Sequence, residues 1–134
     1  MKLVVAYDES NSSLNALAVA VERARVVVGS VVYLVHSLTE NDGDKVKRIE
    51  TSEQALDQAC RKLTDQGIAC EAHLLIHGSV PGEEIVRFAA DIQADEILVG
   101  VIKESRVGKM LLGSTAQYVV LNAPCPVTTV RRTL

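Results

Sequence analysis

Apolar runs alternate with amphipathic segments along this chain, and that alternation restricts the fold more than any other feature of the sequence. Residues 2–7 (KLVVAY) and 97–100 (ILVG) are almost continuously apolar. A strand with one face in water alternates apolar and polar residues, whereas a continuous run is typical of a parallel strand that is covered on both faces. The two runs therefore predict a parallel sheet between two layers of helices.

Helical segments connect the predicted strands. In the first of them, Leu14, Leu17 and Val21 recur at helical spacing, with Glu22 and Arg25 on other faces. The predicted strands are 2–7, 30–38, 68–78, 95–100 and 126–131, and the predicted helices run from Ser10, from 45 to 66, from Pro81, and from Ser114 to about Ala123. Because parallel crossovers are right-handed, we predict a doubly wound open α/β sheet of five strands in the order 3-2-1-4-5, with helices on both faces.

Composition restricts the class of protein. The 134 residues, 48% of them hydrophobic, suit one domain over residues 1–134. A net charge of −3 and the lack of a Lys/Arg-rich block exclude a dedicated surface for nucleic acid or an anionic membrane. The first apolar run is too short for a secretory signal, and no apolar run has the length of a membrane span. We expect a soluble, cytoplasmic protein.

The cysteines indicate neither a disulfide framework nor a zinc site. Cys60, Cys70 and Cys125 are odd in number and widely spaced. Buried, reduced thiols are the expectation for all three.

The predicted topology places a ligand site where the strand order reverses, at the carboxyl ends of the first and fourth strands. The segment that follows the fourth strand ends in Gly113-Ser114-Thr115, which opens the last helix. Ser114 and Gln117 have the spacing of a capping box, and the free N–H groups of such a helix end favour an anion such as phosphate. The alternative is that Ser114 only caps the helix and that Gly100 and Gly113 only form turns.

Several common site motifs are missing. A Walker loop needs glycine where this chain has Lys103 and a hydroxyl residue where it has Met110, and the first strand–helix turn (AYDESNSS) has no glycine for a dinucleotide fingerprint. No Gly-x-Ser-x-Gly elbow occurs, and His36, His73 and His77 lack the spacing of metal ligands. We therefore assign no catalytic residue and no metal ligand, and expect a protein that is not an enzyme.

Several motifs resemble those of the universal stress protein family, which has an adenine nucleotide alpha hydrolase-like fold. The first strand ends in an Asp-x-Ser-x-x-Ser turn (Asp8, Ser10, Ser13), and the chain's last segment contains Ala-Pro-Cys-Pro-Val (residues 123–127), which leads into the last strand. Nucleotide-binding members are similar in carrying Gly, two residues, Gly, nine residues, and Gly with Ser or Thr. Here Gly100 and Gly113-Ser114 stand at the outer positions, while Lys103 replaces the middle glycine.

The resemblance implies an ATP site, with or without Mg²⁺, and a homodimer formed through the last strand. The residues it implies for the adenosine and the phosphates are Ala6, Tyr7, Asp8, Ser37, Val99, Gly100, Gly113, Ser114 and Thr115. Ala6, Tyr7 and Asp8 would border the adenosine, Ser37 the adenine, and the remaining residues the ribose and phosphates.

Two departures from the family pattern leave two functions open. A side chain at Lys103 either blocks the site or, together with Arg106 and Lys109, supplies cations for a triphosphate. Glu9 stands where many members have glycine and adds a negative charge. The preferred function is a small stress-response or regulatory protein that binds ATP with little or no hydrolysis. The alternative is a nucleotide-free dimer that acts through an unknown protein partner.

Overall fold

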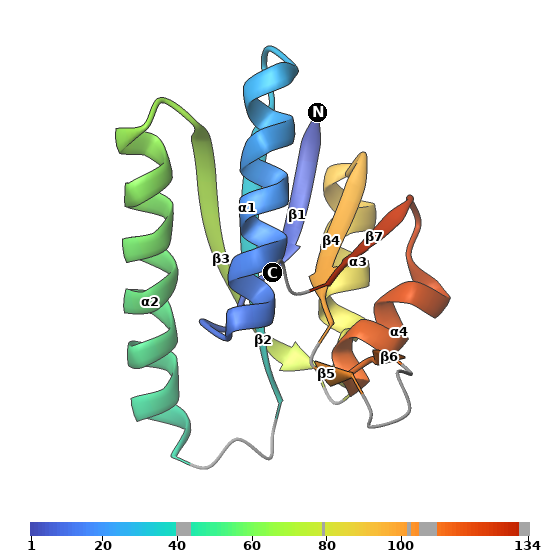
Figure 1. Ribbon diagram of the computed structural model, residues 1–134. Helices are drawn as coiled ribbons and strands as arrows, with labels where there is room; N and C mark the ends of the chain where they lie inside the picture. Colours follow the sequence, from blue (N-terminus) through green and yellow to red (C-terminus); the bar gives the residue numbers. More distant parts are fainter. Residues whose placement is uncertain (40–43, 79, 102, 105–109, 132–134) are drawn as a thin grey trace.

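Five parallel strands form the central layer of the protein in the computed structural model, which describes residues 1–39, 44–78, 80–101, 103–104 and 110–131 (Figure 1). The elements are β1 (Lys2–Ala6), α1 (Asn11–Val26), β2 (Val31–Thr39), α2 (Lys45–Asp65), β3 (Ala69–Gly78), α3 (Glu83–Ile92), β4 (Glu96–Gly100), β5 (Lys103–Glu104), β6 (Met110–Leu111), α4 (Ser114–Asn122) and β7 (Val127–Val130). The sheet order β3-β2-β1-β4-β7 confirms the predicted order and fold class.

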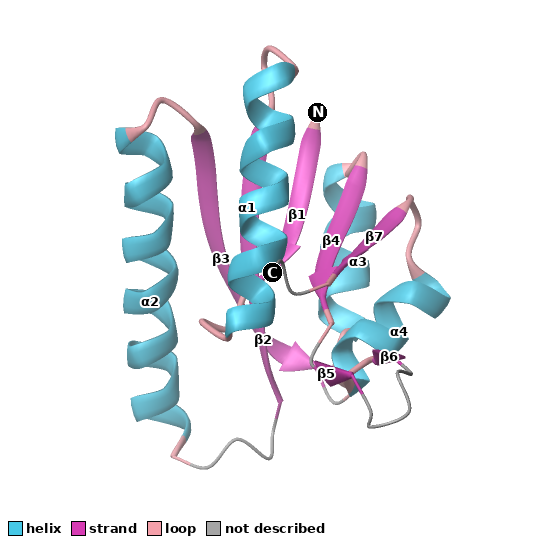
Figure 2. Ribbon diagram, viewed as in Figure 1, coloured by secondary structure: helices cyan, strands magenta, loops and turns pink. Residues whose placement is uncertain are grey.

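Burial explains why the first and fourth predicted strands are continuously apolar. Val5 is paired with Leu34 of β2 on one side and with Leu98 of β4 on the other, and all three side chains are fully buried. Helices α1 and α2 cover one face of the sheet, and α3 and α4 cover the other (Figure 2). A strand between two helical layers has no wet face, so polar alternation is absent.

The segment after β4 contains a feature that the sequence analysis did not predict. Residues 103–104 and 110–111 pair as a short antiparallel hairpin, with Lys103 opposite Leu111. Strands of two residues are too short to produce a recognisable alternation of apolar and polar side chains. This hairpin, β5–β6, lies outside the main sheet.

The start of the third helix differs from the prediction. Pro81 was expected in its first turn, but α3 begins at Glu83, and Gly82 is its N-cap with φ of 90°. This left-handed backbone conformation suits glycine and cannot belong to the helix. Pro81 therefore lies before the cap.

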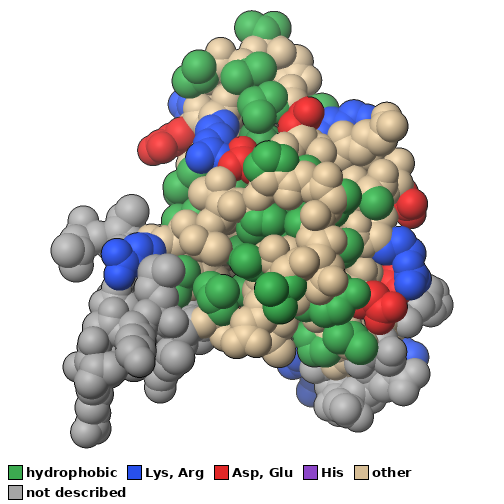
Figure 3. Space-filling view, turned by 90° about the vertical axis from the view of Figure 1, so that its right-hand side faces the viewer, with side chains coloured by type: hydrophobic (Ala, Val, Ile, Leu, Met, Phe, Trp, Pro, Cys, Tyr) green, Lys and Arg blue, Asp and Glu red, His purple; other side chains and the backbone are tan. Residues whose placement is uncertain are grey.

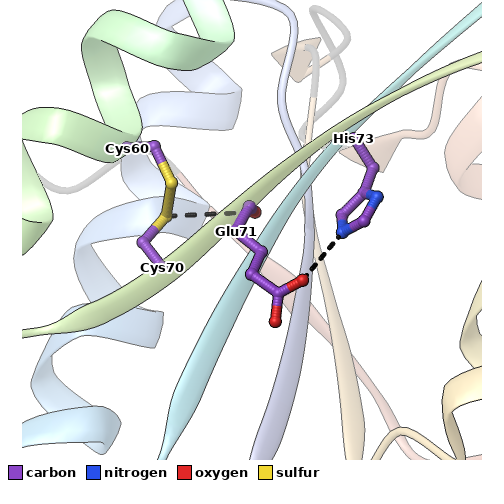
Figure 4. A network of polar contacts seen from close by, with 4 residues as sticks. All are labelled: Cys60, Cys70, Glu71 and His73. Carbon is purple, nitrogen blue, oxygen red and sulfur yellow. Dashed lines mark hydrogen bonds and ion pairs between the residues drawn. A yellow bond between two sulfur atoms is a disulfide. The ribbon is translucent and has the colours of Figure 1, made fainter.

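The expectation of three reduced cysteines was wrong for two of them. Cys60 of α2 and Cys70 of β3 form a disulfide, and Cys125 is free (Figure 4). The Cα atoms of the pair are 5.5 Å apart, a normal disulfide separation. The pairing depends on how α2 packs on β3, which cysteine spacing does not reveal. Among the described helices, none combines the length and the apolar composition needed to cross a membrane.

Candidate functional site

A cavity of about 160 Å³ lies at the carboxyl ends of β1 and β4, the predicted position of the site. The structure places most of the predicted site residues around it: Ala6, Tyr7, Asp8, Ser37, Val99, Gly100, Gly113, Ser114 and Thr115. Lys109 and Arg106 lie outside the described residues, and of Lys103 only the backbone, in β5, belongs to them. The cavity therefore joins the ends of three strands to the beginning of α4.

Other lining residues were not predicted: Ser10, Ser12, Ser13, Val35, His36, Ile85 and Ala116. The three serines belong to the polar turn after β1, whose run of hydroxyl residues was a signal for them. Val35 and Ile85 are at most 2% exposed, and their sequence pattern is that of ordinary core residues. Together with Val99 they give the cavity an apolar side against which a flat ring can pack.

Hydrogen bonds within the β1–α1 turn fix Asp8. The Ser10 backbone N–H donates to Asp8 Oδ1 over 3.0 Å, and the Asp8 N–H donates to Ser13 Oγ over 3.4 Å. Ser10 is also the N-cap of α1, because its Oγ accepts from the Ser13 N–H. The carboxylate at the end of β1 is thus held by the start of the following helix.

Asp8 remains ionised in this setting. Burial alone would raise the pKa of Asp8, but hydrogen bonds from Ser10 and Ser13 and the nearby charge of His36 outweigh burial, so the pKa lies below its usual value. Burial also raises the pKa of Tyr7, and the charges of Glu9 and Asp8 raise it further. At neutral pH the cavity therefore contains one carboxylate and one neutral phenol from adjacent positions.

Glu9 lies away from the cavity even though it follows Asp8 directly. It lines the groove between α1 and α2 and a small pocket beside it. Its φ of 68° is in the left-handed region, where residues other than glycine are strained. This conformation explains why glycine suits the position.

The N-terminus of α4 is open toward the cavity. Gly113 is its N-cap, and no side chain among the described residues hydrogen-bonds to the cap. The predicted capping box of Ser114 and Gln117 was wrong: Ser114 is already the first helical residue, and Gln117 Nε2 donates instead to the Leu112 carbonyl over 3.3 Å. The first N–H groups of α4 are therefore left for another acceptor.

The Ser37 hydroxyl is a second group that awaits a partner. Ser37 Oγ is buried, lines the cavity and makes no hydrogen bond in the described part of the chain. A buried hydroxyl without a partner is costly, so such groups usually meet a ligand or a water molecule. The cavity thus has unused hydrogen-bonding groups on β2 and on α4.

Comparisons with known proteins agree with this geometry. Residues 1–131 match the model of the universal stress protein family. A universal stress protein of Thermus aquaticus is 33% identical over 96% of this chain and 97% of its own length. The structure of a universal stress protein from Archaeoglobus fulgidus has 37% identity and a TM-score of 0.83, covering 97% of this chain and 98% of that one.

A further Archaeoglobus fulgidus structure is of the universal stress protein in complex with dAMP. It has 34% identity and a TM-score of 0.76, and 97% of each chain is covered. The family model, the sequence relatives and the solved structures agree over nearly the whole chain. The chain belongs to the universal stress protein family.

Proposed function

We propose that this protein binds an adenine nucleotide, ATP, in the cavity at the ends of β1 and β4, with little or no hydrolysis, in a stress-response or regulatory role. The observation that carries the proposal is the buried Ser37 Oγ, which lines the cavity and has no hydrogen-bond partner among the described residues. The open N-terminus of α4 in the same cavity adds a place for an anion. One ligand with a polar ring at one end and phosphates at the other would give Ser37 a hydrogen-bond partner and place an anion at the N-terminus of α4.

Each part of the nucleotide is assigned to lining residues of matching chemistry. The adenine packs against Val35 and Val99 and hydrogen-bonds to Ser37, while the ionised Asp8 accepts from the ribose hydroxyls. The phosphates bind at the backbone N–H groups and hydroxyls that follow Gly113. The Archaeoglobus fulgidus relative solved with dAMP supports an adenine nucleotide as the ligand class.

Lys103, Arg106 and Lys109 are proposed to supply positive charge to the triphosphate, with Mg²⁺ entering together with the nucleotide. Charge from these side chains would replace the role of the missing middle glycine. If Arg106→Ala and Lys109→Ala together leave the ATP affinity unchanged, this part of the proposal fails.

The lining gives little support for catalysis. Hydrolysis needs a residue that orients the attacking water. The one carboxylate among the described residues around the cavity, Asp8, already accepts a hydrogen bond from Ser10. We therefore propose binding rather than turnover, and phosphate release under excess ATP measures the difference.

The test is calorimetric titration of ATP with Mg²⁺ into nucleotide-stripped protein. Micromolar binding is expected, with loss of binding in Gly113→Val and a loss of about tenfold in Ser37→Ala, as for one hydrogen bond of about 1.4 kcal/mol. Ser30→Ala is the matched control, because Ser30 precedes β2 at the opposite end of that strand. A folded protein that binds no ATP would favour the alternative, a nucleotide-free interaction protein.

A homodimer through β7 is the proposed assembly. Among the described strands, β7 pairs with β4 alone and forms an edge of the sheet, and Val120 and Leu121 on the adjacent α4 are 43% and 81% exposed. Figure 3 looks onto this side of the molecule and shows hydrophobic side chains spread across it. Unpaired edges recruit another strand.

Sedimentation at tens of micromolar tests the dimer. The Pro126 carbonyl accepts a hydrogen bond from Ile97 of β4, and the Val130 carbonyl accepts one from Val101, directly after β4. By the alternation of a parallel ladder, the Thr129 N–H therefore faces outward. Thr129→Pro removes that donor without breaking the β4 pairing and should give a monomer. A wild-type monomer would contradict the proposal.

A further inference from the structure

The Cys60–Cys70 disulfide joins α2 to an edge strand of the sheet (Figure 4). Cys60 lies in the C-terminal half of α2, and Cys70 is the second residue of β3. Both side chains also belong to the apolar cluster on this face of the sheet. The helix and strand therefore stay in contact when the bond is reduced, although the covalent link between them is lost.

Helix α2 has a narrow non-covalent attachment to the sheet. Its buried residues form a single row: Leu56, Ala59, Cys60 and Leu63. A groove of about 570 Å³ between α2 and α1 runs along this row, and Ala59 and Leu63 line it. The disulfide adds a covalent link to this single row of buried side chains, which packs against β2 and β3.

The same helix stands behind the candidate nucleotide site. Ser52, Ala55 and Leu56 of α2 line a small pocket together with Tyr7, Asp8 and His36. Those last three residues also line the nucleotide cavity. A change in how firmly α2 is held is therefore transmitted directly to the back of that cavity.

We propose that Cys60 and Cys70 are a reversible redox modification site: the disulfide locks α2 onto β3, and its reduction loosens α2 behind the nucleotide cavity. The effect on nucleotide affinity rests on the proposed function. The effect on α2 itself does not.

The reaction is thiol–disulfide exchange with a small-molecule disulfide such as oxidised glutathione. Cys70 is more exposed than Cys60, which is 9% exposed, so the Cys70 thiolate makes the first attack and one glutathione thiol leaves. The Cys60 thiolate then attacks the Cys70 sulfur of the mixed disulfide, and the second glutathione thiol leaves. Two electrons pass from the protein to the oxidant, and a dithiol reverses both steps.

The reduced state has a partner for one thiol. Cys70 Sγ lies 4.0 Å from the Glu71 carbonyl oxygen, within reach of the weak hydrogen bond that a thiol donates (Figure 4). Cys60 stays in its apolar surroundings, which suit an uncharged thiol.

The test compares the full chain in oxidised and reduced glutathione buffers, with the redox state read by thiol alkylation and mass spectrometry. Reduction should lower Tm by on the order of 10 °C, since the bond closes a short loop. Amide exchange in α2 should accelerate at least tenfold more than exchange in α3 on the other face, which changes only through the lower global stability. Equal Tm and equal α2 exchange in both buffers would overturn the proposal.

Two variants distinguish the redox response of the Cys60–Cys70 pair from a response of the free cysteine. Cys70→Ser should behave in both buffers like the reduced wild type. Cys125→Ser removes the free cysteine and should keep the full redox response. A response that disappears with Cys125→Ser would assign the effect to the wrong thiol and overturn the proposal.

ATP titration of both redox forms completes the test. A several-fold weaker affinity of the reduced form supports the coupling to the cavity, and equal affinities overturn it. If neither form binds ATP, the proposed function fails, whereas Tm and amide exchange still decide whether the pair controls α2.

Discussion

A Cβ atom on Gly100 would lie 2.2 Å from the backbone carbonyl oxygen of Ser12. Gly100 ends β4, and Ser12 lies in the first turn of α1, so the strand end and the helix start touch through backbone alone. Both residues line the cavity at the carboxyl ends of β1 and β4. Because Gly100 has no side chain, the start of α1 can approach the end of β4 closely, and this contact forms part of the cavity wall. Contact with a phosphate would be a second role of Gly100.

Gly100→Ala should destabilise the protein by about 3 kcal/mol, the upper end of the usual cost of overpacking, because backbone cannot rotate away as a side chain can. Urea unfolding measures this free energy, and ATP affinity should fall with it. Gly29→Ala is the control: Gly29 has φ of 82° and open space around its missing Cβ. That substitution should cost only about 1 kcal/mol. Equal costs at the two positions would contradict the steric argument.

Glu9→Gly should stabilise the protein by about 0.5–1 kcal/mol. The φ of 68° strains a residue that has a Cβ, and this relief exceeds the greater freedom that glycine gives the unfolded chain. Urea unfolding at neutral pH gives the value.

Gln93→Gly is the matched control for Glu9→Gly, because Gln93 has a φ of 55° at the C-cap of α3. Both variants should gain stability. Removing the negative charge of Glu9 should strengthen ATP binding slightly, whereas Gln93→Gly should leave it unchanged. A loss of stability in Glu9→Gly would show that its side chain makes a contact that outweighs the strain.

Ser37→Ala should stabilise the ligand-free protein by about 1 kcal/mol, because it removes a buried hydroxyl without a partner. Ser30→Ala should do the opposite, since Ser30 Oγ donates to the Val27 carbonyl over 2.7 Å. Thermal unfolding without nucleotide compares the two. A destabilised Ser37→Ala would mean that the hydroxyl has a partner in the free protein.

Much of the fold could be predicted because its signals are local. The apolar run of β1 and the helical spacing of Leu17 and Val21 each depend on neighbouring residues, and handedness rules then set the strand order. The position of the cavity follows from that order. Gly100 and Gly113 could be placed there because each ends or begins an element at the switch point.

The remaining features depend on distances between segments. Cys60 and Cys70 pair only because α2 packs on β3, and Ile85 reaches the cavity only because α3 packs across the sheet. Whether Gly113 or Ser114 is the N-cap depends on the backbone conformation of a single turn. Local sequence patterns predict the ends of helices and strands less well than their middles.

Arg23→Met should cost about 2–3 kcal/mol of stability. Arg23 pairs with Glu96, which is 7% exposed, and both contact Thr128 of the edge strand β7. Without Arg23 the Glu96 carboxylate is buried and uncompensated. The double variant Arg23→Met with Glu96→Leu should recover most of the loss in urea unfolding. No recovery would mean that Arg23 acts by packing rather than by charge.

Asp8→Asn tests the charge at the end of β1. The pKa of Asp8 is lower in the folded protein than its ordinary value of 3.8, so the ionised form adds stability above pH 3.8. That contribution disappears as the pH falls through the folded-state pKa, because the unfolded chain takes up the proton first. The difference in free energy of unfolding between wild type and Asp8→Asn should therefore shrink as the pH falls below 3.8. Urea unfolding at a series of pH values measures it, and a difference that grows in acid would show that Asp8 is stabilised in its protonated form.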